Sequence, residues 1–292
     1  MSWGRQELKI KTGTGVEQMF LHKKQLQFEA KPERPDPVFA NKVQEVLGGQ
    51  YGEISVMMQY LLQGWNCRAD EKYRDMLLDI GTEEIGHVEM LATLIARLLD
   101  KAPVKMQEEA VAKDPAIAAV MGGMNPQHAI VGGLGALPVN SAGVPWSGSY
   151  IVSSGNLIAD FRANLNAESQ GRLQVVRLYE MTDDPGVKKT LSFLIARDTM
   201  HQNQWLAALR ELEEQEGVVV PSTFPPEQEP EEFTHLFVNH SEGKESAKGR
   251  WASGESIDGK GEFKFVEPFA SNDRVGQQPA PPYVHGTLPI VK

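Results

Sequence analysis

Two short motifs constrain the fold of this chain more than any other feature, because each pairs a carboxylate with a histidine at one spacing. Glu84 and His87 form the first motif, and Asp198 and His201 form the second. Residues three positions apart on an α-helix project from one face, about one turn apart. Each motif therefore predicts a helix that presents an acid and an imidazole on the same side.

The hydrophobic pattern around these motifs predicts four long helices. Apolar residues recur at alternating steps of three and four, which is the period of a helix with one buried face. The predicted helices cover about residues 36–63, 70–99, 154–182 and 185–215. The inward stripe predicted for the first helix is Val43, Val46, Gln50, Glu53, Met57 and Tyr60. Gly48-Gly49 is expected to weaken that helix locally, and Gly217 is expected to end the fourth.

Two further carboxylates indicate that the four helices form two near-equivalent hairpins. Glu53 precedes the first histidine by 34 positions (53 to 87), and Glu168 precedes the second by 33 positions (168 to 201). A long, glycine-rich connection of about residues 101–150 separates the hairpins and is expected to cross the bundle or to cover a site. The predicted fold is all-α, a ferritin-like four-helix bundle with a long crossover.

In such a bundle the four inward stripes face one axis, which would bring six acidic or imidazole side chains to one level. They are Glu53, Glu84, His87, Glu168, Asp198 and His201. Burying several carboxylates together is prohibitive unless cations neutralise them. Oxygen-rich ligation with two imidazoles and no thiolate suits iron or manganese better than structural zinc. The pattern predicts two metals about 3.5–4 Å apart and redox chemistry on a small oxygen species.

Charge and composition disfavour several other classes of protein. With 29 basic and 39 acidic residues, the formal charge of −10 disfavours nucleic acid or an anionic membrane as the main partner. The single cysteine, Cys67, fits a reducing compartment. No stretch approaches the roughly 20 apolar residues of a membrane span, and Met1–Gly15 does not resemble a signal peptide. We expect a soluble, cytoplasmic protein.

The composition changes after Gly217, which predicts a boundary between residues 1–217 and residues 218–292. Nine of the 18 prolines lie in the second segment. We expect this C-terminal extension to be extended and largely irregular, because its periodicity is weak. Its aromatic residues favour packing on the bundle or on a neighbouring subunit.

Four runs of residues resemble the manganese catalase family. They are Gly48–Glu53, Glu83–Glu89, Asn166–Arg172 and Ala196–Gln202, and the similarity covers essentially the whole chain from about Met19. The resemblance implies two manganese ions per subunit, which disproportionate hydrogen peroxide to water and dioxygen by cycling between Mn(II)₂ and Mn(III)₂. It also implies a homo-oligomer, a hexamer, and a role under oxidative stress.

The resemblance implies five metal ligands and one residue outside the ligand shell. Glu53 and His87 are expected to bind one manganese, Glu168 and His201 the other, and Glu84 both. Asp198 occupies the position of a glutamate outside the ligand shell in many family members, and its shorter side chain makes ligation less favourable still. We expect it to relay protons or orient a histidine. Tyr60 is expected to donate a hydrogen bond to a ligand carboxylate or to be an ordinary core residue.

The resemblance also implies a calcium site away from the redox centre. Asp75 and Asp79 lie roughly opposite Glu84 around the second predicted helix, and alone they are more often part of a solvated face. Some manganese catalases bind calcium with helix aspartates and tail residues of this kind. We therefore expect calcium, which prefers oxygen ligands, to be bound by Asp75, Asp79, Asn239, Ser241 and Gly243.

Two other functions remain open from the residues alone. One is a ferritin-like di-iron oxidase or iron-binding protein, because spacing does not distinguish iron from manganese. The other is a structural or assembly protein with a vestigial metal site. Asp198 and the family-like flanking runs favour the catalase. The connection 101–150 is expected to shape access to the buried site.

Overall fold

The computed structural model describes residues 22–100 and 125–273, together with residues 276 and 284. It divides into two compact units, Met1–Gly217 and Val218–Lys292, and each is described by itself. Within the described residues, no helix is both long and apolar enough to cross a membrane.

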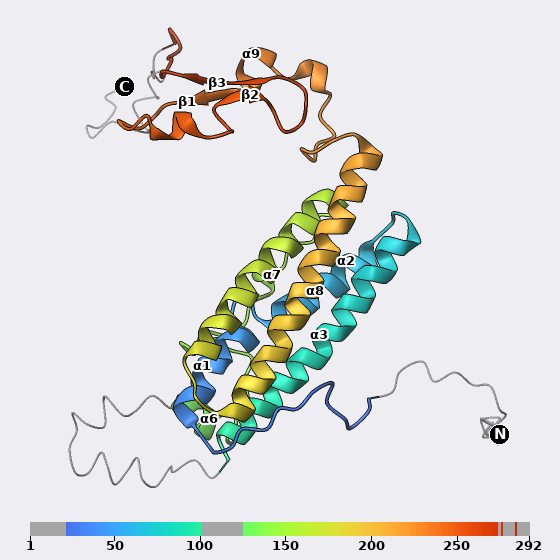
Figure 1. Ribbon diagram of the computed structural model, residues 1–292, viewed down its shortest axis with the longest axis vertical. Helices are drawn as coiled ribbons and strands as arrows, with labels where there is room; N and C mark the ends of the chain where they lie inside the picture. Colours follow the sequence, from blue (N-terminus) through green and yellow to red (C-terminus); the bar gives the residue numbers. More distant parts are fainter. Residues whose placement is uncertain (1–21, 101–124, 274–275, 277–283, 285–292) are drawn as a thin grey trace, which may run out of the picture. The chain divides into compact units, whose positions relative to one another are not determined.

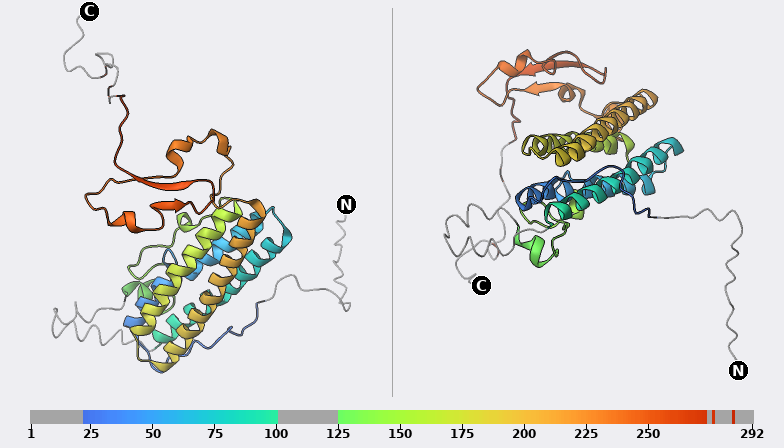
Figure 2. Two further views of the ribbon diagram at one scale, coloured as in Figure 1. Left: turned by 45° about the horizontal axis from the view of Figure 1, so that its top comes forward. Right: turned by 60° about the horizontal axis from the view of Figure 1, so that its bottom comes forward.

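The first unit is a bundle of four long helices in two hairpins, as the sequence predicted. The first hairpin consists of α2 (Glu53–Asn66) and α3 (Glu71–Leu98), and the second of α7 (Leu157–Glu180) and α8 (Pro185–Glu216). A shorter helix, α1 (Pro37–Gly48), precedes the first hairpin. Figure 1 labels these helices, and the right panel of Figure 2 shows the two hairpins as two layers. The prediction of an all-α, ferritin-like bundle is confirmed.

Apolar side chains from several helices fill one end of this bundle. The core there includes Val43, Leu47, Leu91, Leu94, Leu98, Val187, Leu191 and Leu194. Those on α3 follow His87 and those on α8 precede His201, so this part of the core lies on one side of the two motifs. Burying these apolar side chains helps to hold the two hairpins together.

The first predicted helix is broken, so the prediction of one continuous helix over residues 36–63 was wrong. α1 ends at Gly48, and α2 begins at Glu53. A Cβ atom on Gly48 would lie 2.2 Å from the carbonyl oxygen of Val139, so another segment crosses there in direct contact with the backbone. Gln50 is exposed rather than inward-facing. The break makes Glu53 the first residue of its helix.

The other helix ends follow from capping residues. Asp70 caps α3 by accepting a hydrogen bond from the Lys72 N–H. Asp184 caps α8 through the Val187 N–H. Gly217 ends α8 as predicted, in the left-handed conformation with φ of 67°, which glycine adopts without a steric penalty.

Residues 22–36, here called the strap, cross α3 and α8 without forming a helix or a strand. Ala30 of the strap is fully buried, and its carbonyl accepts a hydrogen bond of 2.9 Å from Arg97. Phe28 stacks on Phe193 of α8, with ring centroids 4.4 Å apart and planes 2° from parallel. The strap therefore covers the face where the first and second hairpins meet.

The described part of the long connection is held to α1 and α2 by polar contacts. It contains α6 (Pro126–Ile130) and a short 3₁₀ helix, η1 (Gly148–Tyr150). Gln44 donates a hydrogen bond of 2.7 Å to the Val139 carbonyl, and Trp146 donates one of 2.9 Å to Ser55. Residues 101–124 of the predicted connection lie outside the described residues.

The second unit contains a small sheet that the sequence pattern did not predict. Its elements are η2 (Pro226–Gln228), α9 (Glu231–Thr234), β1 (Leu236–Val238), η3 (Glu245–Lys248), β2 (Ser253–Glu255) and β3 (Glu262–Val266). The strand order is β1-β3-β2, with β1 parallel and β2 antiparallel to β3. Phe237 and Phe265 pack across the parallel pair, with ring centroids 5.1 Å apart.

Candidate metal centre

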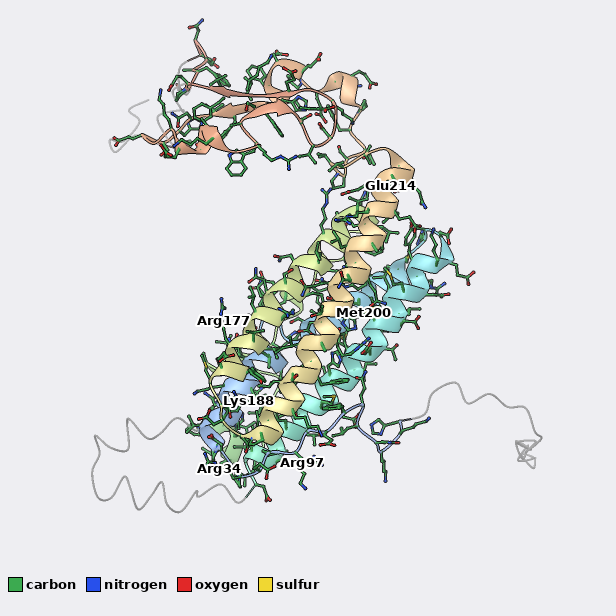
Figure 3. All side chains as sticks on the ribbon, in the orientation of Figure 1. Arg34, Arg97, Arg177, Lys188, Met200 and Glu214 are labelled. Atoms are coloured by element: carbon green, nitrogen blue, oxygen red, sulfur yellow. The ribbon has the colours of Figure 1, made fainter. Side chains whose placement is uncertain are left out.

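Four helices bring the six predicted side chains together in the interior of the bundle. Their exposed fractions are 7% for Glu53, 1% for Glu84, 0% for His87, 4% for Glu168, 5% for Asp198 and 0% for His201. The helical period explains this burial, since each helix turns the side chains of one face toward the interior. Met200, labelled in Figure 3 on α8, is 46% exposed although the next residue is fully buried.

The six side chains form two groups of three, and each group combines both hairpins. Within each group, one ligand atom from every residue lies within 4.8 Å of the others. The first group is Glu53, His87 and Asp198, and the second is Glu84, Glu168 and His201. Glu84 comes from the first hairpin but belongs to the second group. Asp198 comes from the second hairpin but belongs to the first group. Each group therefore offers a carboxylate–imidazole–carboxylate set.

Glu84 lies between the two imidazoles. Its Oε2 is 2.6 Å from Nδ1 of His87, and its Oε1 is 2.8 Å from Nδ1 of His201. The same nitrogens lie 3.6 Å from Glu53 and 3.6 Å from Glu168, respectively. Both imidazoles therefore turn Nδ1 toward the carboxylates, and one carboxylate reaches both of them.

Burial and the negative charges of neighbouring carboxylates raise the pKa values of several residues in the cluster. Burial, with the charge of Glu84 next, raises the pKa of Glu53 to about 8. Burial and the charges of Glu53, Glu168 and Glu84 also raise the pKa of Asp198 well above its usual range. Burial alone would lower the pKa of His201, but the surrounding carboxylates raise it to about 12. Without cations, these residues retain protons that a metal would displace.

The residues present fit a pair of metal ions. Nδ1 of His201 is buried and has no hydrogen-bond partner among the described residues, although a carboxylate oxygen lies 2.8 Å away. An unpaired buried nitrogen costs about 1–3 kcal/mol, and coordination to a cation would satisfy it. Several carboxylates with two imidazoles and no thiolate form the oxygen-rich donor set that suits manganese or iron.

Glu83 is a further residue of the site that the sequence pattern did not single out. Its Oε2 accepts a hydrogen bond of 3.1 Å from Nε2 of His201. Its Oε1 lies 3.7 Å from Nε2 of His87. Arg197 donates to both oxygens at 2.5 and 3.0 Å, and Gln27 of the strap donates to Oε1 at 2.8 Å. Glu83 and Arg197 each stand one position before a motif, which is the signal that could have identified them.

Aromatic side chains close the site on the side opposite the apolar core. The hydroxyl of Tyr60 donates a hydrogen bond of 2.7 Å to Oε1 of Glu168. The Tyr60 ring lies 4.9 Å from that of Trp205, which in turn lies 5.3 Å from that of Phe161. All three rings are fully buried. Apolar layers on both sides therefore exclude bulk water from the carboxylates.

The residues predicted to bind calcium lie in different units. Asp75 and Asp79 are exposed on α3 of the first unit. Asn239, Ser241 and Gly243 lie in the second, where Asn239 Oδ1 accepts from the Ser241 N–H at 3.3 Å. Since each unit is described by itself, the calcium site stays a prediction.

Comparison with known proteins places this chain among the manganese catalases. A family model described as manganese containing catalase matches residues 19–292. A manganese catalase from Bacillus subtilis is 65% identical over 272 residues, which are 93% of this chain and 99% of that protein. One from Lactiplantibacillus plantarum is 50% identical over 225 residues, 77% of this chain and 84% of that protein.

The fold of this chain also matches that of a manganese catalase of known structure. The crystal structure of KatB, a manganese catalase from Anabaena, matches with a TM-score of 0.65 and 28% identity. The match covers 86% of this chain and 100% of that chain. Together with the family model and the relatives of high identity, it shows that this chain belongs to the manganese catalase family.

Proposed function

We propose that this protein disproportionates hydrogen peroxide to water and dioxygen at a buried dimanganese centre. The observation that carries the proposal is the position of Glu84, whose two oxygens each approach Nδ1 of a different imidazole, at 2.6 and 2.8 Å. A carboxylate shared in this way is what a dinuclear site requires. Family membership supports manganese as the metal.

Five residues are proposed to hold the two ions. Glu53 and His87 would hold one ion, Glu168 and His201 would hold the other, and Glu84 would contribute to both. Bound manganese would give up one electron per ion to reduce one peroxide to water and would take one electron per ion from a second peroxide, which becomes dioxygen, so both half-reactions would transfer two electrons. The protein supplies a buried site that keeps the ligands close together and away from bulk water.

Asp198 is proposed to take up and return the protons of peroxide. Its carboxylate is buried beside Glu53 and His87, and no hydrogen bond to it is found within the described residues. Burial and the neighbouring negative charges raise its pKa, which suits a group that gains and loses a proton during turnover. Its place in the first group would also permit ligation, so metal content distinguishes the two roles.

Tyr60 is proposed to position Glu168. The hydroxyl is buried and its hydrogen bond of 2.7 Å holds one oxygen of that carboxylate. Burial and the charge of Glu168 raise the pKa of Tyr60, so the phenol remains a donor at physiological pH. A fixed carboxylate presents its second oxygen in one orientation.

The decisive experiment measures metal content and oxygen release on the same purified sample. We expect two manganese ions per chain and oxygen release from added peroxide, with no haem absorption band. Iron in place of manganese, without oxygen release, would favour the ferritin-like oxidase or iron-binding alternative. Azide sensitivity serves as a control against a contaminating haem enzyme.

We also propose that Asp75 and Asp79 bind calcium together with Asn239, Ser241 and Gly243. The two aspartates are exposed one turn apart, and the tail positions offer hard oxygen ligands. Calcium should raise the melting temperature of the wild-type protein. Replacing both aspartates with alanine should remove that rise, and a rise that persists would count against the site.

We propose a cytoplasmic homo-hexamer as the working state. The family resemblance supports the hexamer, and the single cysteine supports a reducing compartment. Sedimentation equilibrium on the full-length chain would measure the assembly directly, and a monomer at micromolar concentration would contradict it.

A further inference from the structure

Glu83 lies on the side of the imidazoles away from the cluster, where it accepts a hydrogen bond from His201, whereas Nε2 of His87 is buried without a hydrogen-bond partner among the described residues. Its Oε2 is 3.1 Å from Nε2 of His201, and its Oε1 is 3.7 Å from Nε2 of His87. Nδ1 of each ring faces Glu84 instead, at 2.8 and 2.6 Å respectively. Each imidazole is therefore placed between the same inner carboxylate and the same outer carboxylate.

The position of Glu83 is fixed by partners on two other segments. Nε of Arg197 donates to Oε1 at 2.5 Å, and its second terminal nitrogen donates to Oε2 at 3.0 Å. A guanidinium that contacts both oxygens is among the stronger and more directional partners of a carboxylate. Gln27 adds a third hydrogen bond, 2.8 Å to Oε1. Both oxygens of Glu83 are thus occupied by donors and oriented toward the imidazoles.

The strap lies against α3 next to Glu83. The side chain of Glu83 is only 19% exposed, and Gln27 lies so close to α3 that a Cβ atom on Gly86 would be 2.9 Å from its Oε1. The strap therefore supports Glu83 directly.

An acceptor at Nε2 has a defined chemical effect on a metal-binding histidine. A neutral imidazole that coordinates through Nδ1 carries its proton on Nε2, so a carboxylate at Nε2 selects that tautomer and raises the basicity of Nδ1. We propose that Glu83, held by Arg197, is the positioning residue of the metal-binding imidazole of His201, whose Nε2 donates to it. This inference rests on the proposed ligand set.

The first test is Glu83→Gln, which keeps the size of the side chain but removes its charge and one of its two acceptors. We expect manganese affinity to fall about 10–100-fold. The electron paramagnetic resonance spectrum of bound Mn(II) should also change, because at least one ligand loses its fixed orientation. The control is Glu89→Gln, since Glu89 lies on the same helix and also pairs with the strap, through His22 at 2.9 Å. The control should bind manganese like the wild type.

A second variant separates positioning from a general effect on folding. Replacing Glu83 and Arg197 together with methionine keeps the packing between α3 and α8 without leaving an unpaired charge, and such replacements are often neutral for stability. We expect a melting temperature close to that of the wild type, with manganese binding as weak as in Glu83→Gln.

The outcomes distinguish this inference from the proposed function. If the wild type binds two manganese ions and either variant of Glu83 matches it in affinity and spectrum, Glu83 does not position the imidazole of His201. If the wild type binds no manganese, the dimanganese proposal itself fails. Weak binding in both variants, with a normal control, supports the inference.

Discussion

The two hairpins of the bundle contribute the same set of residues except at two adjacent positions. Each provides one early carboxylate and one motif histidine, all of them buried. The motif acid is Glu84 in the first hairpin and Asp198 in the second, and the residue before it is Glu83 or Arg197. Glu84 reaches both imidazoles, and Glu83 pairs with Arg197 across the hairpins. The two near-equivalent hairpins are thus asymmetric where they meet.

Among substitutions at the positions where the hairpins differ, Glu84→Ala is expected to have the largest effect on metal content and activity. Because Glu84 is the carboxylate proposed to contact both ions, its loss should remove both metals and abolish oxygen release. The effect should exceed the roughly 10–100-fold loss typical of residues outside the ligand shell. Elemental analysis and peroxide turnover on the same sample measure it. A variant that keeps two manganese ions would show that Glu84 does not bridge them.

The equivalent change in the second hairpin should act differently. Asp198→Asn should retain both manganese ions and reduce turnover by about 10²–10⁴-fold, the range typical of a lost proton-transfer group. Asp198→Glu is the matched variant. Unlike Asp198→Asn it keeps a titratable carboxyl group, and it gives both motifs the same acid. If Asp198→Asn instead loses one ion per chain, Asp198 is a metal ligand. The motif acids of the two hairpins would then both bind metal.

Removing the metals should leave the buried carboxylates of both hairpins to repel one another, which should make the stability of the protein depend on pH. The folded-state pKa values of Glu53 (about 8) and His201 (about 12) lie above the ordinary values of 4.5 and 6.5. The folded metal-free protein therefore binds more protons than the unfolded chain near neutral pH, and its stability falls as pH rises from about 6.5 through 8.

Each such group contributes up to about 1.4 kcal/mol per pH unit, and each kcal/mol shifts the melting temperature by roughly 2–4 °C in a unit of this size. Thermal unfolding of metal-free protein between pH 6 and about 9 tests this. Manganese-loaded protein is the control and should show a weaker dependence. A melting temperature of the metal-free form that rises with pH would contradict the prediction.

The smallest of these effects is expected from Tyr60→Phe, which tests a contact between the two hairpins. The change removes the hydrogen bond to Glu168 and leaves the ring packing against Trp205. Turnover should fall up to about 10-fold with both metals retained, and stability should fall by about 1 kcal/mol. Steady-state kinetics with a urea titration measures both. Unchanged kinetics would make Tyr60 an ordinary core residue.

The main helices and the convergence of the six side chains were predictable, because both depend on spacing along single helices. Periods of three and four place Glu84 beside His87 and Asp198 beside His201 whatever the surroundings are. The break before Glu53 was not predictable in the same way. It depends on the contact between Gly48 and the Val139 backbone, which are far apart in the chain.

Glu83 and the small sheet were missed for different reasons. A charged residue next to a buried ligand normally lies on a solvated face, and the role of Glu83 depends on Arg197 and on the strap. Strands of three residues, such as β1 and β2, are too short for an alternating pattern to emerge. Local spacing predicted the ligands, whereas their support comes from tertiary contacts.

The break between α1 and α2 makes the electrostatic surroundings of two matching ligands unequal. Glu53 is the first residue of α2, where the unpaired N–H groups of the first turn create partial positive charge that favours an anion. Glu168 lies in the middle of α7, where the helix dipole offers no such preference. A glycine at position 48 thus gives the two halves of the centre different electric fields, although their ligands are the same residue types.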